Sequence, residues 1–171
     1  NITVKGTNSC GDGVASTKAI TVNPLPANAG TISGSSTVCQ GQNVVTYIVP
    51  NIANATSYVW TMPNGAIGTS TTNSITVDYN TTAISGNITV KGINACGDGV
   101  VSSKAITVNP LPVAAGTISG NETVCQGQTS VTYTVPVITN ATSYVWTLPT
   151  GATGTSSTNS ITVSYGTTAV S

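Results

Sequence analysis

Few side chains in this chain could take part in chemistry. Four cysteines, four carboxylates and four lysines are spread over 171 residues, and histidine and arginine are absent. Without histidine the chain cannot build a Ser-His-Asp or Cys-His device for nucleophilic catalysis. A glycosidase needs two carboxyl groups about 5–10 Å apart, whereas the acids fall in separate turns or on outward strand positions: Asp12, Asp78, Asp98 and Glu122. We therefore expect no enzymatic activity and no cofactor.

The same residue types are poor candidates for a metal site. Asp12 and Asp98 each lie in a Gly-Asp-Gly segment. Calcium takes about six to eight oxygen ligands, so we interpret this segment as a hairpin turn. The cysteines lack the close Cys-x-x-Cys spacing and the histidines that are typical of zinc sites. We expect no metal ligand in the chain.

The cysteines recur because the chain repeats itself. Residues 1–85 align without a gap on residues 87–171, so that Cys10 falls on Cys96 and Cys39 on Cys125, in each case 86 residues later. Of the 85 aligned positions, 65 are identical. A gapless period of this length indicates tandem copies of one folding unit, which usually serve as scaffolds, spacers or binding surfaces.

Each copy is predicted to consist of short strands. Apolar residues alternate with period two over the segments 45–49, 57–61, 74–79, 87–91 and 100–108. The last two form a hairpin joined at Gly97-Asp98-Gly99, and segments 29–32 and 36–39 supply a split first strand. About seven short strands with frequent turn signals predict an all-β fold of tandem seven-stranded immunoglobulin-like sandwiches.

The segment Asn-Pro-Leu-Pro marks the domain boundaries. It occurs at 23–26 and 109–112, and its prolines interrupt a strand ladder and favour a stiff, extended connector. Residues 1–23 are then the last hairpin of an upstream repeat, 24–109 a complete sandwich, and 110–171 a sandwich that lacks its last hairpin. We expect residues 24–109 to be the autonomous folding unit.

Composition argues against two classes of partner. The formal net charge is zero, which gives no electrostatic attraction for nucleic acid. No apolar run approaches the roughly 20 residues that cross a bilayer, so we expect no membrane insertion. No signal peptide is visible, although the chain opens inside a repeat and a targeting segment could precede it.

Two aromatic pairs are candidate core residues. Tyr58 and Trp60 share one face of their strand, as do Tyr144 and Trp146 in the other copy. A tryptophan on a central strand of an immunoglobulin-like sandwich is usually a core residue. If these rings were exposed they could stack on sugars, but we interpret all four residues as core.

Several motifs together carry a family resemblance. They are Thr-Val-Cys-Gln-Gly-Gln, Ser-Tyr-Val-Trp-Thr-(Met/Leu)-Pro-x-Gly, Asn-Ser-Ile-Thr-Val-x-Tyr and Asn-Ile-Thr-Val-Lys-Gly-x-Asn-x-Cys-Gly. With the closing Ala-Ile-Thr-Val-Asn-Pro-Leu-Pro, the whole chain resembles the PKD-like domains of Bacteroidetes surface proteins. The segment 60–65 departs from the Trp-x-Phe-Gly-Asp-Gly stretch of the founding PKD domains. The resemblance implies a seven-stranded sandwich in a long secreted protein, often an adhesin exported by the type IX secretion route.

The cysteine count predicts disulfides and an oxidising compartment. In an immunoglobulin-like sandwich the first and last strands run side by side in parallel, so we predict a Cys39–Cys96 bond. Cys10 and Cys125 would then pair with neighbouring repeats or chains. A rival is a Cys10–Cys39 bond across the linker.

The function that the sequence favours is structural. We expect a repeat unit of a long extracellular fibre, stalk or surface adhesin, in which head-to-tail domains act as a stiff spacer. Its partners would be further copies of itself, in a covalent array or in a filament where residues 1–22 of one chain complete residues 113–171 of the next by strand addition. The alternatives are a module that binds surface glycans or proteins, and an accessory domain of a secreted hydrolase.

Overall fold

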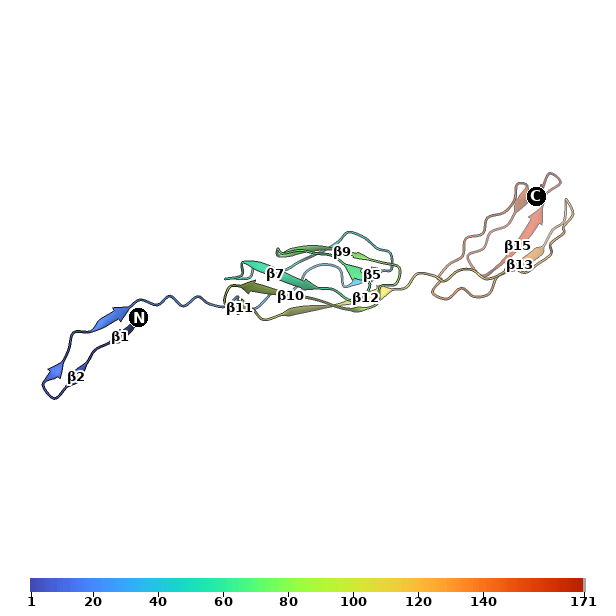
Figure 1. Cartoon of the computed structure of the whole chain (residues 1–171). Helices are drawn as coiled ribbons and strands as arrows, with labels where there is room; N and C mark the ends of the chain where they lie inside the picture. Colours follow the sequence, from blue (N-terminus) through green and yellow to red (C-terminus); the bar gives the residue numbers. More distant parts are fainter. Residues whose placement is uncertain (171) are drawn as a thin grey trace.

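The computed structural model describes residues 1–170, which form three parts in a row (Figure 1). The central part is a β-sandwich with eight strands: β5 (Thr37–Cys39), β6 (Val45–Ile48), β7 (Ser57–Thr61), β8 (Ala66–Ile67), β9 (Ser74–Tyr79), β10 (Gly86–Asn94), β11 (Gly97–Asp98) and β12 (Ser102–Asn109). Residues 1–170 contain no helix, and therefore no helix that could span a membrane. The predicted all-β, immunoglobulin-like fold is confirmed.

Two sheets make up this sandwich. One has the order β11-β10-β12-β5 with β7 on the other side of β10, and the second has the order β6-β9-β8. The first strand is split as predicted: Ser33 bridges to Ile48 in the second sheet, whereas β5 pairs in parallel with β12 in the first. The hairpin β10–β12 therefore lies in the middle of its sheet and holds both β5 and β7.

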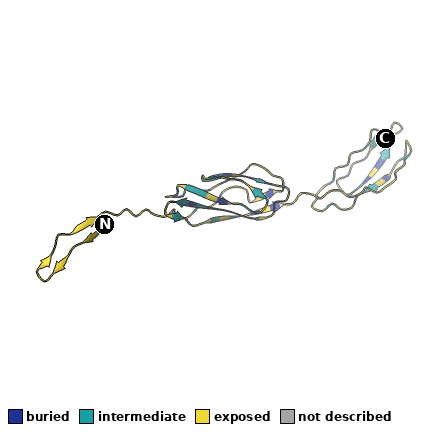
Figure 2. Ribbon diagram, in the orientation of Figure 1, coloured by how far each residue is buried: buried dark blue, intermediate teal, exposed yellow. Residues whose placement is uncertain are grey.

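The core lies between the sheets and follows the period-two pattern. The fully buried side chains come from both sheets and include Tyr47, Ile75, Val77, Ile88, Val90 and Ile106. The hydroxyl groups of Tyr47 and Tyr79 are hydrogen-bonded to each other at 2.8 Å, so the two buried phenols satisfy one another. In Figure 2 this core accounts for the dark blue segments of the central part.

The hairpin turn differs from the prediction. Asn94 pairs with Gly97, so the loop consists of Ala95 and Cys96, while Gly97 and Asp98 belong to the ladder. The turn is fixed by the Asn94 side chain, whose Oδ1 accepts the Cys96 N–H at 2.8 Å. The prediction of a Gly97-Asp98-Gly99 turn was wrong by two residues, because this local hydrogen bond closes the chain earlier.

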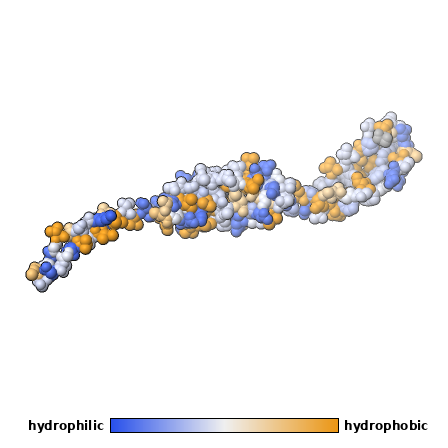
Figure 3. Space-filling view, viewed as in Figure 1, coloured by the Kyte–Doolittle hydropathy of each residue, from blue (hydrophilic) through white to orange (hydrophobic). Residues whose placement is uncertain are grey.

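The N-terminal part is an isolated hairpin of β1 (Ile2–Val4), β2 (Thr7–Asn8), β3 (Gly11–Asp12) and β4 (Ser16–Lys18). β1 pairs with β4, and β2 with β3. Every one of its residues is exposed, and Figure 2 draws the hairpin in yellow. Apolar side chains consequently lie open on its surface (Figure 3), among them Ile2, Val4, Ile20 and Val22.

The C-terminal part retains one sheet. β13 (Val131–Thr134), β14 (Ala152–Thr153) and β15 (Ser160–Tyr165) pair in the order β13-β15-β14, as β6, β9 and β8 do in the central sandwich. The segments 123–125 and 143–147, which correspond to β5 and β7, are not strands. Their central counterparts pair with the β10–β12 hairpin, and residues 110–170 do not include such a hairpin.

Candidate functional site

Three of the four carboxylates form an ion pair or a backbone hydrogen bond within the fold. Asp98 forms an ion pair with Lys91, and Asp12 forms the same pair with Lys5. Asp78 accepts the Val44 N–H at 2.7 Å and so holds the backbone before β6. Within residues 1–170 no three side chains of the metal-binding types gather in one place. The candidate sites are therefore places where strands or domains meet.

Of the predicted aromatic core residues, the two tryptophans differ in burial between the copies, whereas Tyr58 and Tyr144 are both half-buried. Trp60 is 8% exposed and donates its Nε1–H to the Thr72 carbonyl at 2.9 Å, and the Tyr58 hydroxyl accepts the Ile52 N–H at 3.0 Å. Tyr144 and Trp146 make the corresponding hydrogen bonds but are only half-buried, and they line an open hollow. The prediction of a closed core is therefore incomplete for the second copy.

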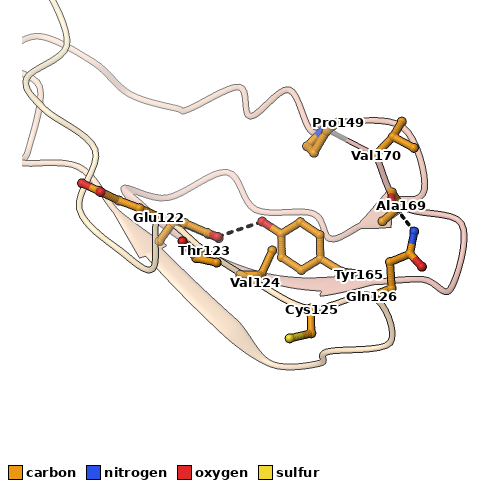
Figure 4. Close-up of a pocket in the computed structure, with 10 residues that line it drawn as sticks. Glu122, Thr123, Val124, Cys125, Gln126, Pro149, Tyr165, Ala169 and Val170 are labelled. Carbon is orange, nitrogen blue, oxygen red and sulfur yellow. Dashed lines mark hydrogen bonds between the residues drawn. The ribbon is translucent and has the colours of Figure 1, made fainter.

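We call two hollows on residues 110–170 the hairpin seat. One is lined by residues that include Val124, Cys125, Tyr133 and Tyr165, and Figure 4 shows it open between the strands, with Gln126 bonded to the Ala169 carbonyl at 3.0 Å. The other is lined by a further set that includes Pro112, Ile138, Ala141, Tyr144 and Trp146.

The central sandwich shows what fills these hollows. Val38, the counterpart of Val124, is buried and stands opposite Val108 of the hairpin. A Cβ placed on Gly92 of the hairpin would meet the Ala55 Cβ at 2.7 Å, the Ile52 Cγ2 at 3.0 Å and Pro26 Cβ at 3.3 Å. These three contacts correspond to Ala141, Ile138 and Pro112 of the second hollow. The seat is thus shaped for a β10–β12 hairpin.

The second candidate site is the pair of ends at which the chain enters and leaves the sandwich. We call residues 94–97 with the linker 23–26 the entrance pole. There the Asn94 Nδ2 donates to the Pro24 carbonyl at 2.9 Å, and Leu25 packs over Gly97 with its Cδ2 3.2 Å from where a Cβ would stand. Pro26 is buried, so the incoming linker is fixed on the domain.

The exit pole consists of Cys39 and Gln40 with residues 109–111. The Gln40 N–H donates to the Asn109 carbonyl at 2.9 Å, and its side-chain Oε1 accepts the Leu111 N–H at 3.1 Å. Sequence reasoning missed both Asn94 and Gln40 as linker contacts. Both residues are identical in the two copies, but this does not single them out as linker contacts, because 65 of the 85 aligned positions are identical.

The two poles overturn the predicted Cys39–Cys96 disulfide. β5 does run parallel to β12, but Cys39 stands opposite Asn109 at the end of β12, whereas Cys96 precedes its beginning. The register places the two cysteines about 13 residue steps apart along the sheet, or about 40 Å. A disulfide needs a Cα separation of about 4.4–6.8 Å. All four cysteines are exposed free thiols in the structure.

The rival Cys10–Cys39 bond fails within one chain for a similar reason. Cys10 lies in the turn between β2 and β3, at the tip of the upstream hairpin, while Cys39 lies at the exit pole of the central sandwich (Figure 1).

A family comparison covers most of the chain. The profile of one protein family, described as PKD-like domain, matches residues 25–108 and again residues 111–171. A comparison with curated proteins found no match. PKD-like domains are typically extracellular modules of immunoglobulin-like fold, and each matched stretch begins at one of the proline linkers. The chain belongs to the PKD-like domain family.

Proposed function

We propose that this chain is a structural repeat unit of an extracellular or cell-surface fibre, stalk or adhesin, without catalytic activity. One observation carries the proposal: the chain enters the central sandwich at one pole and leaves it at the opposite pole (Figure 1). Domains joined in this way follow one another in a line, and each added repeat lengthens the molecule.

The linkers support a stiff array. Each contains two prolines that restrict its backbone. It is also tied to the domains: Asn94 bonds the linker before the sandwich, and Gln40 bonds the linker after it. An array with such joints resists bending more than one with free, glycine-rich linkers.

The hairpin seat supports propagation of the array. The hairpin 1–23 and the hairpin 87–109 agree at 19 of 23 positions, and all four inward apolar residues are the same. In a covalent array the seat on residues 110–170 receives the hairpin of the same repeat. In a filament it receives the N-terminal hairpin of another copy. We favour the covalent array, because an unbroken repeat needs no special mechanism of assembly.

A glycan-binding role has less support. Trp60 is 8% exposed and its indole N–H is bonded to the Thr72 carbonyl, so the ring offers no platform for a sugar.

The family resemblance to Bacteroidetes surface proteins supports secretion, with type IX export and an adhesin context as the finer proposal.

The test is the shape of the completed chain, by which we mean residues 1–171 followed by a second copy of residues 86–109. β10 and β12 have nine and eight residues, which at about 3.3 Å each span about 28 Å. With turns and linker we expect an advance of about 35–45 Å per repeat. Small-angle X-ray scattering and electron microscopy should show an elongated particle with that advance.

A matched control replaces joint contacts that lie outside the hairpin seat: Pro110→Gly and Gln40→Ala in the completed chain. Its two sandwiches should remain folded while the scattering shows a broader distribution of distances. A globular completed chain with its two sandwiches packed side by side would refute the spacer.

A further inference from the structure

We infer that a disulfide joins successive repeats, between the cysteine at the exit pole of one domain and the cysteine at the entrance pole of the next. The inference rests on the proposed head-to-tail arrangement. It concerns Cys39 and the cysteine that the repeat places 86 residues after Cys96, which the completed chain supplies as the appended copy of Cys96.

The exit pole brings Cys39 next to the linker. Cys39 is the ladder partner of Asn109, the first residue of Asn-Pro-Leu-Pro, and paired strands lie about 4.8 Å apart. Val38 is buried and Cys39 exposed, so the thiol lies on the outer side of the sheet. The Cys39 N–H donates to the Gln42 side chain at 2.9 Å, which fixes the backbone there.

The entrance pole brings Cys96 next to the preceding linker. Cys96 lines one hollow together with Asn23 and Pro24. Asn94 holds both sides of this hollow, because its Nδ2 donates to the Pro24 carbonyl at 2.9 Å and its Oδ1 accepts the Cys96 N–H at 2.8 Å. The thiol is therefore on a fixed turn beside the linker.

The repeat unites these two observations. Asn23-Pro24 and Asn109-Pro110 are the same two residues of the repeat. Cys39 adjoins Asn109 from the preceding domain, and the Cys96-type cysteine of the following domain adjoins the same Asn-Pro from the other side. Two thiols, each exposed at its pole, would thus flank one linker, which the Gln40 position bonds from the preceding domain and the Asn94 position bonds from the following domain.

The chemistry is thiol–disulfide exchange. Each thiol loses its proton, one new S–S bond forms, and the two electrons reduce a small-molecule disulfide such as oxidised glutathione to two thiols. Such an oxidant belongs to extracellular compartments. The bond would cross-link the poles on either side of the linker and so limit bending of the array at each joint.

The test uses the completed chain with Cys96→Ser, which leaves four cysteines: Cys10, Cys39, Cys125 and the appended copy of Cys96. The substitution makes the appended tryptic peptide distinguishable from residues 92–104. The protein is equilibrated with oxidised and reduced glutathione, and the monomer is isolated. Free thiols are then alkylated, and trypsin fragments are mapped without reduction.

We expect loss of two of the four alkylated thiols, with residues 19–91 linked to the appended peptide. In the matched control Cys39→Ser, all three remaining cysteines should be alkylated, and its urea unfolding under reducing conditions should match that of the parent. An elongated particle in which Cys39 stays alkylated, or is linked to Cys10, would overturn the disulfide and leave the spacer standing. A compact particle by scattering would overturn the spacer and the disulfide together.

Discussion

The central sandwich and the two outer parts carry nearly the same residues in different surroundings. Ile88 on β10 is 0% exposed, whereas Ile2, its counterpart on β1, is 65% exposed. Ile32 is 2% exposed and Ile118 is 58% exposed. Local sequence gives β6, β8 and β9 and their counterparts β13, β14 and β15 in both copies, whereas the counterparts of β5 and β7 are not strands. Val131, Val135, Ile161 and Val163 are buried without a hairpin, but positions such as Ile88 and Ile32 are buried only where the hairpin and the rest of the sandwich meet. We therefore expect the assembled pair to be the cooperative unit.

The largest expected effect comes from removing the hairpin. Residues 24–109 should unfold in one cooperative urea transition by circular dichroism, whereas residues 24–85 should show none. Without β10 and β12, both β5 and β7 lose their ladder partners, and the apolar face of the other sheet stays open.

Residues 1–85 provide a permuted control. They contain a hairpin, residues 1–23, that precedes residues 24–85 in the chain, whereas the hairpin of the central sandwich follows them. We therefore expect no cooperative transition unless the displaced hairpin docks on residues 24–85. Cooperative unfolding of residues 24–85 would show that this region folds without the hairpin, which would contradict the expected dependence of the two on each other.

A matched pair of substitutions sharpens the comparison at one residue. Ile88→Ala should destabilise the central sandwich by about 2–5 kcal/mol, because it leaves a cavity in a closed core. Ile2→Ala removes the same atoms from an exposed hairpin and should change this stability by less than about 0.5 kcal/mol. Trp60 fluorescence in a Trp146→Phe background reports the urea midpoint of the central sandwich. Equal effects of the two substitutions would contradict the assigned burial.

Some of this organisation could be read from sequence because it is local. Alternating apolar residues identified β7 and β9 with their observed bounds, and the split of the first strand followed from residues 29–39. The cysteine pairing could not be read in this way. Knowing that β5 and β12 are parallel neighbours does not place Cys96, because a turn that precedes β12 lies a full strand length from Asn109.

The candidate sites were harder to predict than the strands. The linker contacts of Asn94 and Gln40 depend on where each turn closes, and that is decided by single side-chain hydrogen bonds. The hairpin seat is also invisible in sequence, since Val38 and Val124 are the same residue type at the same repeat position. Their different burial follows from tertiary contacts alone.

A third comparison concerns the two tyrosine pairs and pH. Burial raises the pKa of Tyr79, and its hydrogen bond with Tyr47 raises it further; burial also raises the pKa of Tyr47. The folded state then keeps protons that the unfolded chain loses above about pH 10. The stabilising effect of these neutral phenols is fully present below that pH and is lost as the pH rises above it.

We therefore expect the urea midpoint of the central sandwich to fall above about pH 10. Replacing both residues, Tyr47→Phe with Tyr79→Phe, removes the two hydrogen-bond partners together and leaves neither unpaired, so it should change the stability at pH 7 by less than about 1 kcal/mol and flatten the alkaline decline. The matched control is Tyr133→Phe with Tyr165→Phe, which should leave the central transition unchanged at every pH. The pKa of Tyr133 is raised chiefly by its hydrogen bond with Tyr165, but that pair lies outside the closed core. An unaltered alkaline decline in the Tyr47–Tyr79 double variant would assign it to other groups.

The smallest expected effect concerns the ion pairs of the two hairpins. Lys91–Asp98 has side chains 30% and 57% exposed, and Lys5–Asp12 has side chains 50% and 54% exposed. Solvent screens both pairs, so Asp98→Asn should destabilise the central sandwich by about 0.2–1 kcal/mol. Asp12→Asn should leave it unchanged, since its hairpin packs on nothing. A decrease for Asp98→Asn that persists in 1 M NaCl would contradict an exposed pair, because ions at that concentration screen charges beyond about 3 Å. A measurable decrease for Asp12→Asn would show instead that the upstream hairpin contributes to the central fold, which would weaken the contrast between the two regions.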